Sequence, residues 1–137
     1  MSVTVGRYVP DATTYLAKGV PAAMPDALAT VHQLRDRVAT FVHERDWEQY
    51  HNPKDIAISM SVEAAELLEL FQWRAEDEID LRDAAFREAV EDELADVFVY
   101  CLSLANAIGC DLSDVTLRKL AKNERKYPAG EWKGRAR

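Results

Sequence analysis

Hydrophobic residues recur at helical spacing along most of the chain. Between residues 26 and 128, apolar side chains stand three and four positions apart, which is the period of a helix that packs one face against its neighbours. We therefore predict four helices. Their expected ranges are Asp26 to His43 or slightly beyond, Pro53 to about Trp73, about Asp83 to Ile108, and a fourth helix that ends before Pro128.

Capping residues mark several ends of these helices. Asn52 is suited to be an N-cap and is followed by Pro53, which favours the first helical position. Gly109 is expected to end the third helix, and either Asp111 or Ser113 can cap the fourth. These signals define the helix boundaries more sharply than the periodicity does.

Two of the apolar helix faces contain an acidic residue where an apolar one is expected. The faces are Ile56, Met60, Glu63, Leu67 and Leu70 in the second helix, and Phe86, Val90, Glu93, Val97, Tyr100 and Leu104 in the third. Glu63 and Glu93 each stand in the middle of their face. An ionised carboxylate in an apolar interior is unfavourable unless a cation neutralises it, so both positions need an explanation.

Each of these glutamates has a second acidic residue three positions further on. Glu66 follows Glu63 and Asp96 follows Glu93, and residues three apart are neighbours on a helix, with Cβ atoms about 5–6 Å apart. Because a short connection makes the two helices antiparallel neighbours, we expect all four carboxylates to face one another. Like charges this close require protons or metal ions, and oxygen ligands favour Mg²⁺ or Mn²⁺ over Zn²⁺. Glu69 lies about 120° from this face and is expected to be solvated.

Composition favours an all-α fold in one domain. The chain has 137 residues, of which 48% are hydrophobic and 30% charged, with only five glycines and five prolines. Residues 26–128 are expected to form the domain, residues 1–25 an N-terminal arm and residues 129–137 a basic C-terminal tail. The longest apolar run is too short to cross a bilayer, and Cys101 and Cys110 have neither metal-site nor disulfide spacing. We therefore expect a cytoplasmic protein with reduced thiols and no contact with a membrane.

Charge is distributed unevenly along the chain. The net charge of −7 argues against a nucleic-acid-binding protein, because such proteins usually present a basic surface. Residues 118–137 nevertheless carry a local balance of +6, which leaves −13 on residues 1–117. This arrangement is compatible with one site that uses both signs, and equally with a solvated basic tail on an acidic domain.

Four segments together resemble a known enzyme family. In this order, "ERDWEQYHNP", "SVEAAELLELFQW", "EDELADVFVY" and "KNERKYP" are similar to the all-α nucleotide pyrophosphohydrolases of the MazG-related superfamily, above all to the branch that cleaves dCTP and its modified forms. The resemblance covers roughly residues 26–128. It implies a four-helix bundle-like subunit that assembles into homodimers or homotetramers. It also implies Mg²⁺-dependent hydrolysis of a nucleoside triphosphate to the monophosphate and pyrophosphate, for control or sanitation of the nucleotide pool.

The same resemblance implies roles for individual residues. The implied Mg²⁺ ligands and catalytic residues are Glu63, Glu66, Glu93 and Asp96. The implied substrate contacts are Trp47, Glu48, Gln49, Tyr50 and His51 in the loop before the second helix, Trp73 against the base, Asp96, Tyr100 near the sugar or phosphates, and Lys119 and Asn123 at the triphosphate. Aromatic faces stack on bases, which agrees with these roles. Without the resemblance, Trp47 and Trp73 fit equally well in a core, and His51 in a local hydrogen bond.

Mechanism and specificity follow only in outline. Glu63 or Glu66 is the expected acceptor of the proton from the attacking water, while Mg²⁺ neutralises the α- and β-phosphates. The dCTP branch often has a histidine in the first helix where this chain has Val38, so the base preference stays open between dCTP, dUTP and a broad range. A non-catalytic helical interaction module with structural acids is the alternative from another class.

The second predicted helix is apolar around most of its circumference. Ile58, Val62 and Trp73 lie off the face that carries Glu63, so one subunit cannot bury all of its apolar surface. The sequence therefore also predicts a homo-oligomer.

Overall fold

The computed structural model describes residues 24–135, and every regular element among them is a helix. The four longer helices are α2 (Val31–His43), α3 (Pro53–Glu69), α4 (Ala84–Ile108) and α5 (Leu112–Lys126). Three short helical turns are η1 (Glu48–Tyr50), η2 (Glu76–Glu78) and α6 (Ala129–Trp132). The all-α expectation is confirmed for this part of the chain. The N-terminal arm predicted for residues 1–25 lies almost wholly outside the described residues.

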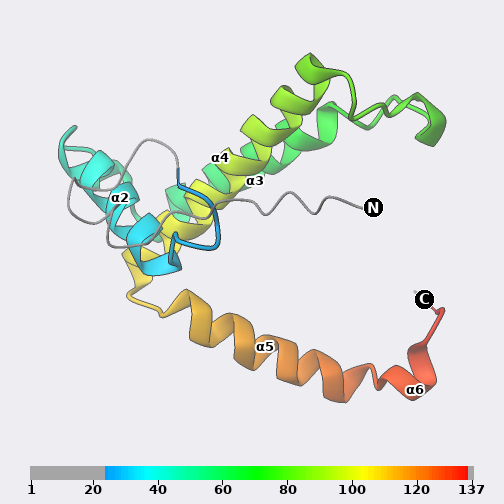
Figure 1. The fold of residues 1–137 in the computed structure, drawn as a ribbon. Coiled ribbons are helices and arrows are strands. Elements are labelled where there is room, and N and C mark those ends of the chain that lie inside the picture. The colour runs from blue at the N-terminus through cyan, green and yellow to red at the C-terminus, as the bar shows by residue number, and fades with distance from the viewer. Residues whose placement is uncertain (1–23, 136–137) are drawn as a thin grey trace, which may run out of the picture.

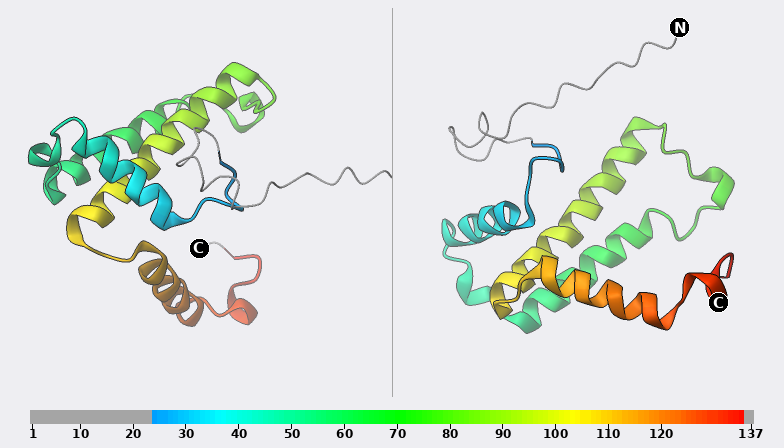
Figure 2. Two further views of the ribbon diagram at one scale, coloured as in Figure 1. Left: turned by 60° about the vertical axis from the view of Figure 1, so that its left-hand side comes forward. Right: turned by 60° about the horizontal axis from the view of Figure 1, so that its bottom comes forward.

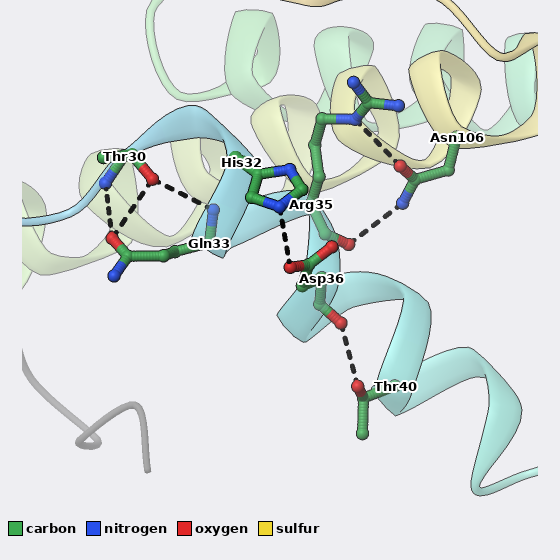
Figure 3. Close-up of polar contacts among 7 residues, drawn as sticks. All are labelled: Thr30, His32, Gln33, Arg35, Asp36, Thr40 and Asn106. Carbon is green, nitrogen blue, oxygen red and sulfur yellow. Dashed lines mark hydrogen bonds and ion pairs between the residues drawn. The ribbon is translucent and has the colours of Figure 1, made fainter. Parts of the chain in front are cut away.

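The predicted start of the first helix is wrong. α2 begins at Val31 rather than Asp26, because Thr30 and Gln33 form a capping box. The Thr30 hydroxyl accepts the Gln33 N–H at 3.2 Å, and the Gln33 side chain accepts the Thr30 N–H at 2.8 Å (Figure 3). Residues 26–28 form a turn before this cap.

The predicted end of the second helix is also wrong. α3 ends at Glu69 rather than Trp73. The N–H groups of Phe71 and Gln72 both donate to the Leu68 carbonyl, at 2.9 Å each, so the last turn tightens and the helix stops.

The remaining caps agree with the sequence. Asn52, Asp83 and Asp111 accept hydrogen bonds of 2.9–3.2 Å from N–H groups in the first turns of α3, α4 and α5. Ser113 lies inside α5 and is not the cap. Gly109 ends α4 with a φ of 64°, in the left-handed region that glycine adopts freely.

α3 and α4 form the body of the subunit. They run antiparallel and side by side, joined by the loop that contains η2 (Figure 1). Every residue of the two predicted helix faces is buried or half-buried. Among the described residues, however, only Ile56, Leu102, Ser103 and Ala105 are fully buried. This core is small for a chain of such length.

α2 packs on α4 through hydrogen bonds between Arg35 and Asn106. Nε of Arg35 donates to Oδ1 of Asn106 at 2.9 Å, and Nδ2 of Asn106 donates to the Arg35 carbonyl at 3.0 Å (Figure 3). Both residues are half-buried. This reciprocal pair fixes α2 near the C-terminal end of α4.

α5 projects away from the other three long helices (Figures 1 and 2). Its apolar residues Leu117 and Leu120 are exposed. Within residues 24–135, three helices therefore pack together, and the expected four-helix subunit is only partly formed. No single described helix is both long and apolar enough to cross a membrane, and α4 and α5 meet that test only as a pair bent by 104°.

Candidate functional site

Three of the four predicted metal ligands meet between α3 and α4. Glu63, Glu66 and Glu93 each offer a carboxylate oxygen, and these oxygens all lie within 4.8 Å of one another. Glu63 and Glu93 are half-buried, whereas Glu66 is exposed. Asp96 lies one turn beyond Glu93 and does not belong to this group of three, but its charge acts on both half-buried glutamates.

The chain itself does not neutralise these carboxylates. Partial burial raises the pKa of Glu63, and the charges of the other three acids raise it further. Partial burial is also the largest cause of the raised pKa of Glu93, followed by neighbouring acids. None of the ion pairs within residues 24–135 includes one of these four acids. The cluster therefore lacks positive charge.

One oxygen of the cluster has no hydrogen-bond partner. Oε2 of Glu93 is buried and accepts no hydrogen bond from the described part of the chain. A buried carboxylate oxygen without a donor is unfavourable, so this atom is suited to a cation. The donors are all carboxylate oxygens, which hard divalent cations prefer. The residues present therefore fit a divalent metal ion.

A pocket of about 660 Å³ opens beside the cluster, between α2, α4 and the loop before α3. We call it the main pocket because it adjoins the cluster. Glu63 and Asp96 line it together with Trp47, His51 and Tyr100, three of the residues predicted to contact a nucleotide. Its size is typical of small-molecule sites. The structure thus brings predicted acids and predicted aromatic contacts to one pocket.

The turn after α2 places Trp47 in this pocket. Asp46 has a φ of 53°, in the left-handed region that few non-glycine residues adopt but aspartate tolerates. Its N–H donates to the His43 carbonyl at 3.0 Å, and the Trp47 N–H donates to the Val42 carbonyl at 3.1 Å. These two bonds end α2 as a Schellman motif. The chain reverses, and the Trp47 ring packs edge-on against Phe41 with centroids 5.8 Å apart.

Glu48 and Gln49 are tied to the end of α2. Glu48 accepts a hydrogen bond of 2.6 Å from Nδ1 of His43, and this bond raises the pKa of His43. The pKa of Glu48 is lowered by its own backbone N–H and then by His43. Gln49 is exposed and donates to the Asp46 carbonyl at 3.1 Å. Glu48, unlike Gln49, lines a smaller pocket beside the main pocket. Glu48 is therefore the better placed of these two residues to contact a ligand.

His51 lies where several pockets meet. Nδ1 of His51 donates to the Trp47 carbonyl at 2.9 Å, which is the local hydrogen bond considered from the sequence. The residue nevertheless lines the main pocket and two smaller ones, one of them together with Tyr50 and Tyr100. The local bond therefore holds His51 in place without removing it from the site.

Besides Glu48, Gln49 and Tyr50, three predicted substrate contacts lie outside the main pocket. Trp73 follows the end of α3 and is 86% exposed, so it is not a core residue within one chain. Lys119 and Asn123 lie on α5, which projects away from α3 and α4 (Figure 1). Within one chain, the structure does not bring these residues to the carboxylates.

Residues of α2 and the following turn, not predicted to contact a ligand, form another wall of the pocket. They include Arg37, Phe41 and Arg45. The helical pattern assigns Phe41 to the buried face, but the residue is 48% exposed. One feature of the sequence could have indicated that Arg45 lines the site. It stands two residues before Trp47 in the segment "ERDWEQYHNP".

Comparison with curated proteins identifies relatives. The model of the MazG-like family matches residues 58–137, more than half of the chain. The protein "dCTP pyrophosphatase 1" of Homo sapiens is 39% identical over 102 residues, covering 73% of this chain and 60% of that protein. Its namesake from Bos taurus is 37% identical over 109 residues, covering 78% of this chain and 64% of that protein. The chain thus spans less than two thirds of the length of these relatives.

A solved structure shares the fold. The crystal structure of a pyrophosphatase from Archaeoglobus fulgidus matches with a TM-score of 0.62 at 36% sequence identity, covering 80% of this chain and 98% of that chain. The family match at residues 58–137 includes the four predicted metal ligands Glu63, Glu66, Glu93 and Asp96. On these grounds, the chain belongs to the MazG-like family.

Proposed function

We propose that this chain hydrolyses a nucleoside triphosphate, dCTP or a modified dCTP, to the monophosphate and pyrophosphate. The observation that carries the proposal is the cluster of Glu63, Glu66 and Glu93 beside a pocket with an aromatic wall. The names of the relatives, dCTP pyrophosphatase 1 and a pyrophosphatase, support the reaction and, for the first, the base. Such a reaction, in the cytoplasm, serves control or sanitation of the nucleotide pool.

Glu63, Glu66, Glu93 and Asp96 are the proposed ligands of Mg²⁺, for which Mn²⁺ can substitute. When bound, the ion neutralises phosphate oxygens and polarises the bond to be cleaved. The chain contributes the carboxylates and partly buries two of them. This burial is the largest cause of the raised pKa values of Glu63 and Glu93.

Glu63 is the proposed acceptor of the proton from the attacking water, with Glu66 as the alternative. Glu63 lines the pocket. Glu66 is exposed and lines a groove on the outer face of α3 instead. Position therefore favours Glu63.

The residues around η1 are proposed to hold the nucleoside. Trp47 lines the pocket and is 42% exposed, and its indole is a surface on which a base can stack. Tyr100 lies one turn beyond Asp96 on α4 and is suited to the sugar or the phosphates. Glu48, Gln49, Tyr50 and His51 complete this set.

Trp73, Lys119 and Asn123 are proposed to reach the site from a second copy of the chain. All three lie outside the pocket of their own chain, and within residues 24–135 α5 does not pack closely on the other long helices. The outer face of α3 also carries a groove with exposed Ile58 and Val62, which a monomer leaves in water. A homodimer or homotetramer covers this surface and supplies the missing residues.

The test is a product assay with dCTP in the presence and absence of Mg²⁺. We expect dCMP and pyrophosphate in equal amounts, no reaction in excess chelator, and loss of turnover in Glu63→Gln. Glu69→Gln changes an exposed glutamate of the same helix and should retain turnover. Comparison with dUTP and the other deoxynucleotides decides between dCTP specificity and a broad range. A chain that cleaves none of them would be the non-catalytic interaction module.

The reaction in ¹⁸O-water identifies the phosphorus that is attacked. Attack at the α-phosphorus places the label in dCMP and leaves pyrophosphate unlabelled. Label in pyrophosphate, or orthophosphate as the first product, would show that the chain is a different phosphohydrolase.

A further inference from the structure

One wall of the main pocket is an ordered stack of three side chains, Phe41, Arg45 and Trp47. Cζ of Arg45 lies 3.7 Å from the centroid of the Phe41 ring and 6.0 Å from that of the Trp47 ring. Phe41 and Trp47 meet edge to face with an interplanar angle of 76°. At 3.7 Å the guanidinium is in van der Waals contact with the face of Phe41, which is a cation–π arrangement.

The chain holds Arg45 in this position without a ligand. An Nη1 hydrogen of Arg45 is donated to the Phe41 carbonyl at 2.9 Å, and the same nitrogen lies 3.7 Å from the Glu44 carboxylate. Arg45 directly precedes Asp46, whose left-handed conformation ends α2. The orientation of the guanidinium is thus set by the end of the helix. Arg37, the other arginine of the pocket, is exposed, and its side chain forms none of the hydrogen bonds or ion pairs found within residues 24–135.

These three side chains support one another but do not form a core. Exposure is 40% for the side chain of Arg45, 48% for Phe41 and 42% for Trp47. One face of the guanidinium lies on Phe41 and one edge on a carbonyl. Because Arg45 lines the pocket and its side chain is 40% exposed, the face away from Phe41 is the one on which a ligand in the pocket could stack. Planar cations and indoles stack well on the planar ring of a nucleobase. A phosphate would instead require the free edges of the guanidinium.

We propose that Arg45 is a base-binding residue, whose open guanidinium face stacks on the nucleobase beside Trp47. The identity of the ligand rests on the proposed function, whereas the role of Arg45 rests on the geometry of the stack. Phe41 is a positioning residue, because its ring and its carbonyl hold the guanidinium of Arg45 in a fixed orientation.

Arg74 offers a matched control at the other end of α3. Its Nε donates to the Leu70 carbonyl, four residues earlier, at 3.1 Å, and its Cζ lies 4.4 Å from the centroid of the Phe86 ring. This is the same combination of a backbone bond and a cation–π contact, beside the loop that contains η2 rather than in the main pocket. A lysine at either position keeps the charge and loses the flat face.

The experiment is calorimetric titration of dCMP, and of deoxyribose 5-phosphate, which has no base, into wild type, Arg45→Lys and Arg74→Lys. We expect wild type and Arg74→Lys to bind dCMP equally and more tightly than deoxyribose 5-phosphate. Arg45→Lys should bind dCMP about tenfold more weakly, with unchanged affinity for deoxyribose 5-phosphate. Melting temperatures of the two variants without ligand measure how much each cation–π contact contributes to the stability of the fold.

Two results would overturn the proposal. An equal loss of affinity for both ligands in Arg45→Lys would assign Arg45 to the phosphate. Unchanged dCMP affinity would make Arg45 a structural contact like Arg74. Because the ligand is a product and no turnover is needed, the proposed reaction fails separately: a chain that binds dCMP through Arg45 but does not cleave dCTP contradicts only that reaction.

Discussion

In the middle of its length, α3 inverts the usual arrangement of a surface helix, although the rest of its inner face is apolar. The face toward α4 carries Glu63 in its middle, with Glu66 beside it, whereas the outer face exposes Ile58, Val62 and Leu68. A surface helix normally places apolar residues inside and charges outside. Packing within residues 24–135 therefore does not account for α3. The inner carboxylates are suited to a cation, and the outer apolar residues to contact with another protein surface, as proposed above.

α4 repeats this inversion. Glu93 lies half-buried in its inner face with an unpartnered oxygen, while Leu94 and Phe98 are exposed. Two neighbouring helices with the same inversion place their acids together and leave their apolar residues on the outside. The inner and outer faces can therefore be tested independently by substitution.

Substitution on the inner face has the largest expected effect. Glu63→Gln and Glu93→Gln should each lower turnover of dCTP by a factor of about 10²–10⁴, because a ligand and, for Glu63, the proton acceptor are lost. Without metal, the melting temperature should stay equal or rise, since a charge leaves a crowded cluster. Steady-state kinetics and thermal melts measure the two effects. Wild-type turnover in both variants would separate the cluster from catalysis.

Substitution on the outer face should break the assembly. Val62→Lys places a charge on the apolar surface of α3, and burying that charge against a second copy is unfavourable by several kcal/mol. Sedimentation velocity should show a smaller species for Val62→Lys than for wild type. Asp77→Lys, which introduces the same side chain at an exposed residue of η2, is the control and should sediment as wild type. The same assembly in all three proteins would show that this face is not an interface.

Trp73→Ala should weaken nucleotide binding with little loss of stability. The indole is 86% exposed, so its removal costs folding less than about 0.5 kcal/mol, whereas a stacked base loses about 1–3 kcal/mol. Titration with a non-hydrolysable dCTP analogue, followed by calorimetry, gives the affinity. Unchanged affinity together with a large fall in melting temperature would make Trp73 a structural residue.

The smallest effect concerns pH. Because the pKa values of Glu63 and Glu93 are raised in the folded chain, folding binds protons, and the metal-free protein should become more stable as the pH falls from neutral through these raised values. This contribution is complete below the ordinary glutamate pKa of 4.5 and is lost as the pH rises through the raised values. His43, whose pKa is also raised, acts in the same direction.

Urea unfolding in chelator at several pH values measures this dependence. The double variant Glu63→Gln/Glu93→Gln should have a shallower slope than wild type, with the part due to His43 left in place. Excess Mg²⁺ should reverse the slope of wild type, because the cation binds the ionised carboxylates. Equal slopes in both proteins would mean that the two glutamates have the same pKa values in the folded and the unfolded chain.

Much of the body of the subunit could be predicted from sequence, because its signals are local. Spacing alone places Glu63 and Glu93 on the inner faces, and Asn52 and Gly109 act as the caps that their residue types favour. The start of α2 was missed although Thr30 and Gln33 form a readable capping box, because the apolar period continues upstream of it.

The α2 wall of the pocket and the place of α5 could not be predicted in this way. The stack of Arg45 on Phe41 depends on a left-handed aspartate, Asp46, which no hydrophobic pattern reveals. The amphipathic pattern of α5 predicts a helix but does not specify which surface covers Leu117 and Leu120. A local backbone conformation decides the first, and non-local contacts decide the second.

Direct titration of Mn²⁺ and Mg²⁺ into the metal-free chain tests the inner face of α3 and α4 most directly. Calorimetry at neutral pH should show binding to wild type and to Glu69→Gln with equal affinity. Glu93→Gln, which alters the acid with the unpartnered oxygen, should bind at least about tenfold more weakly. Equal affinity in all three proteins, or no binding to wild type, would contradict the assignment of these carboxylates to a divalent cation.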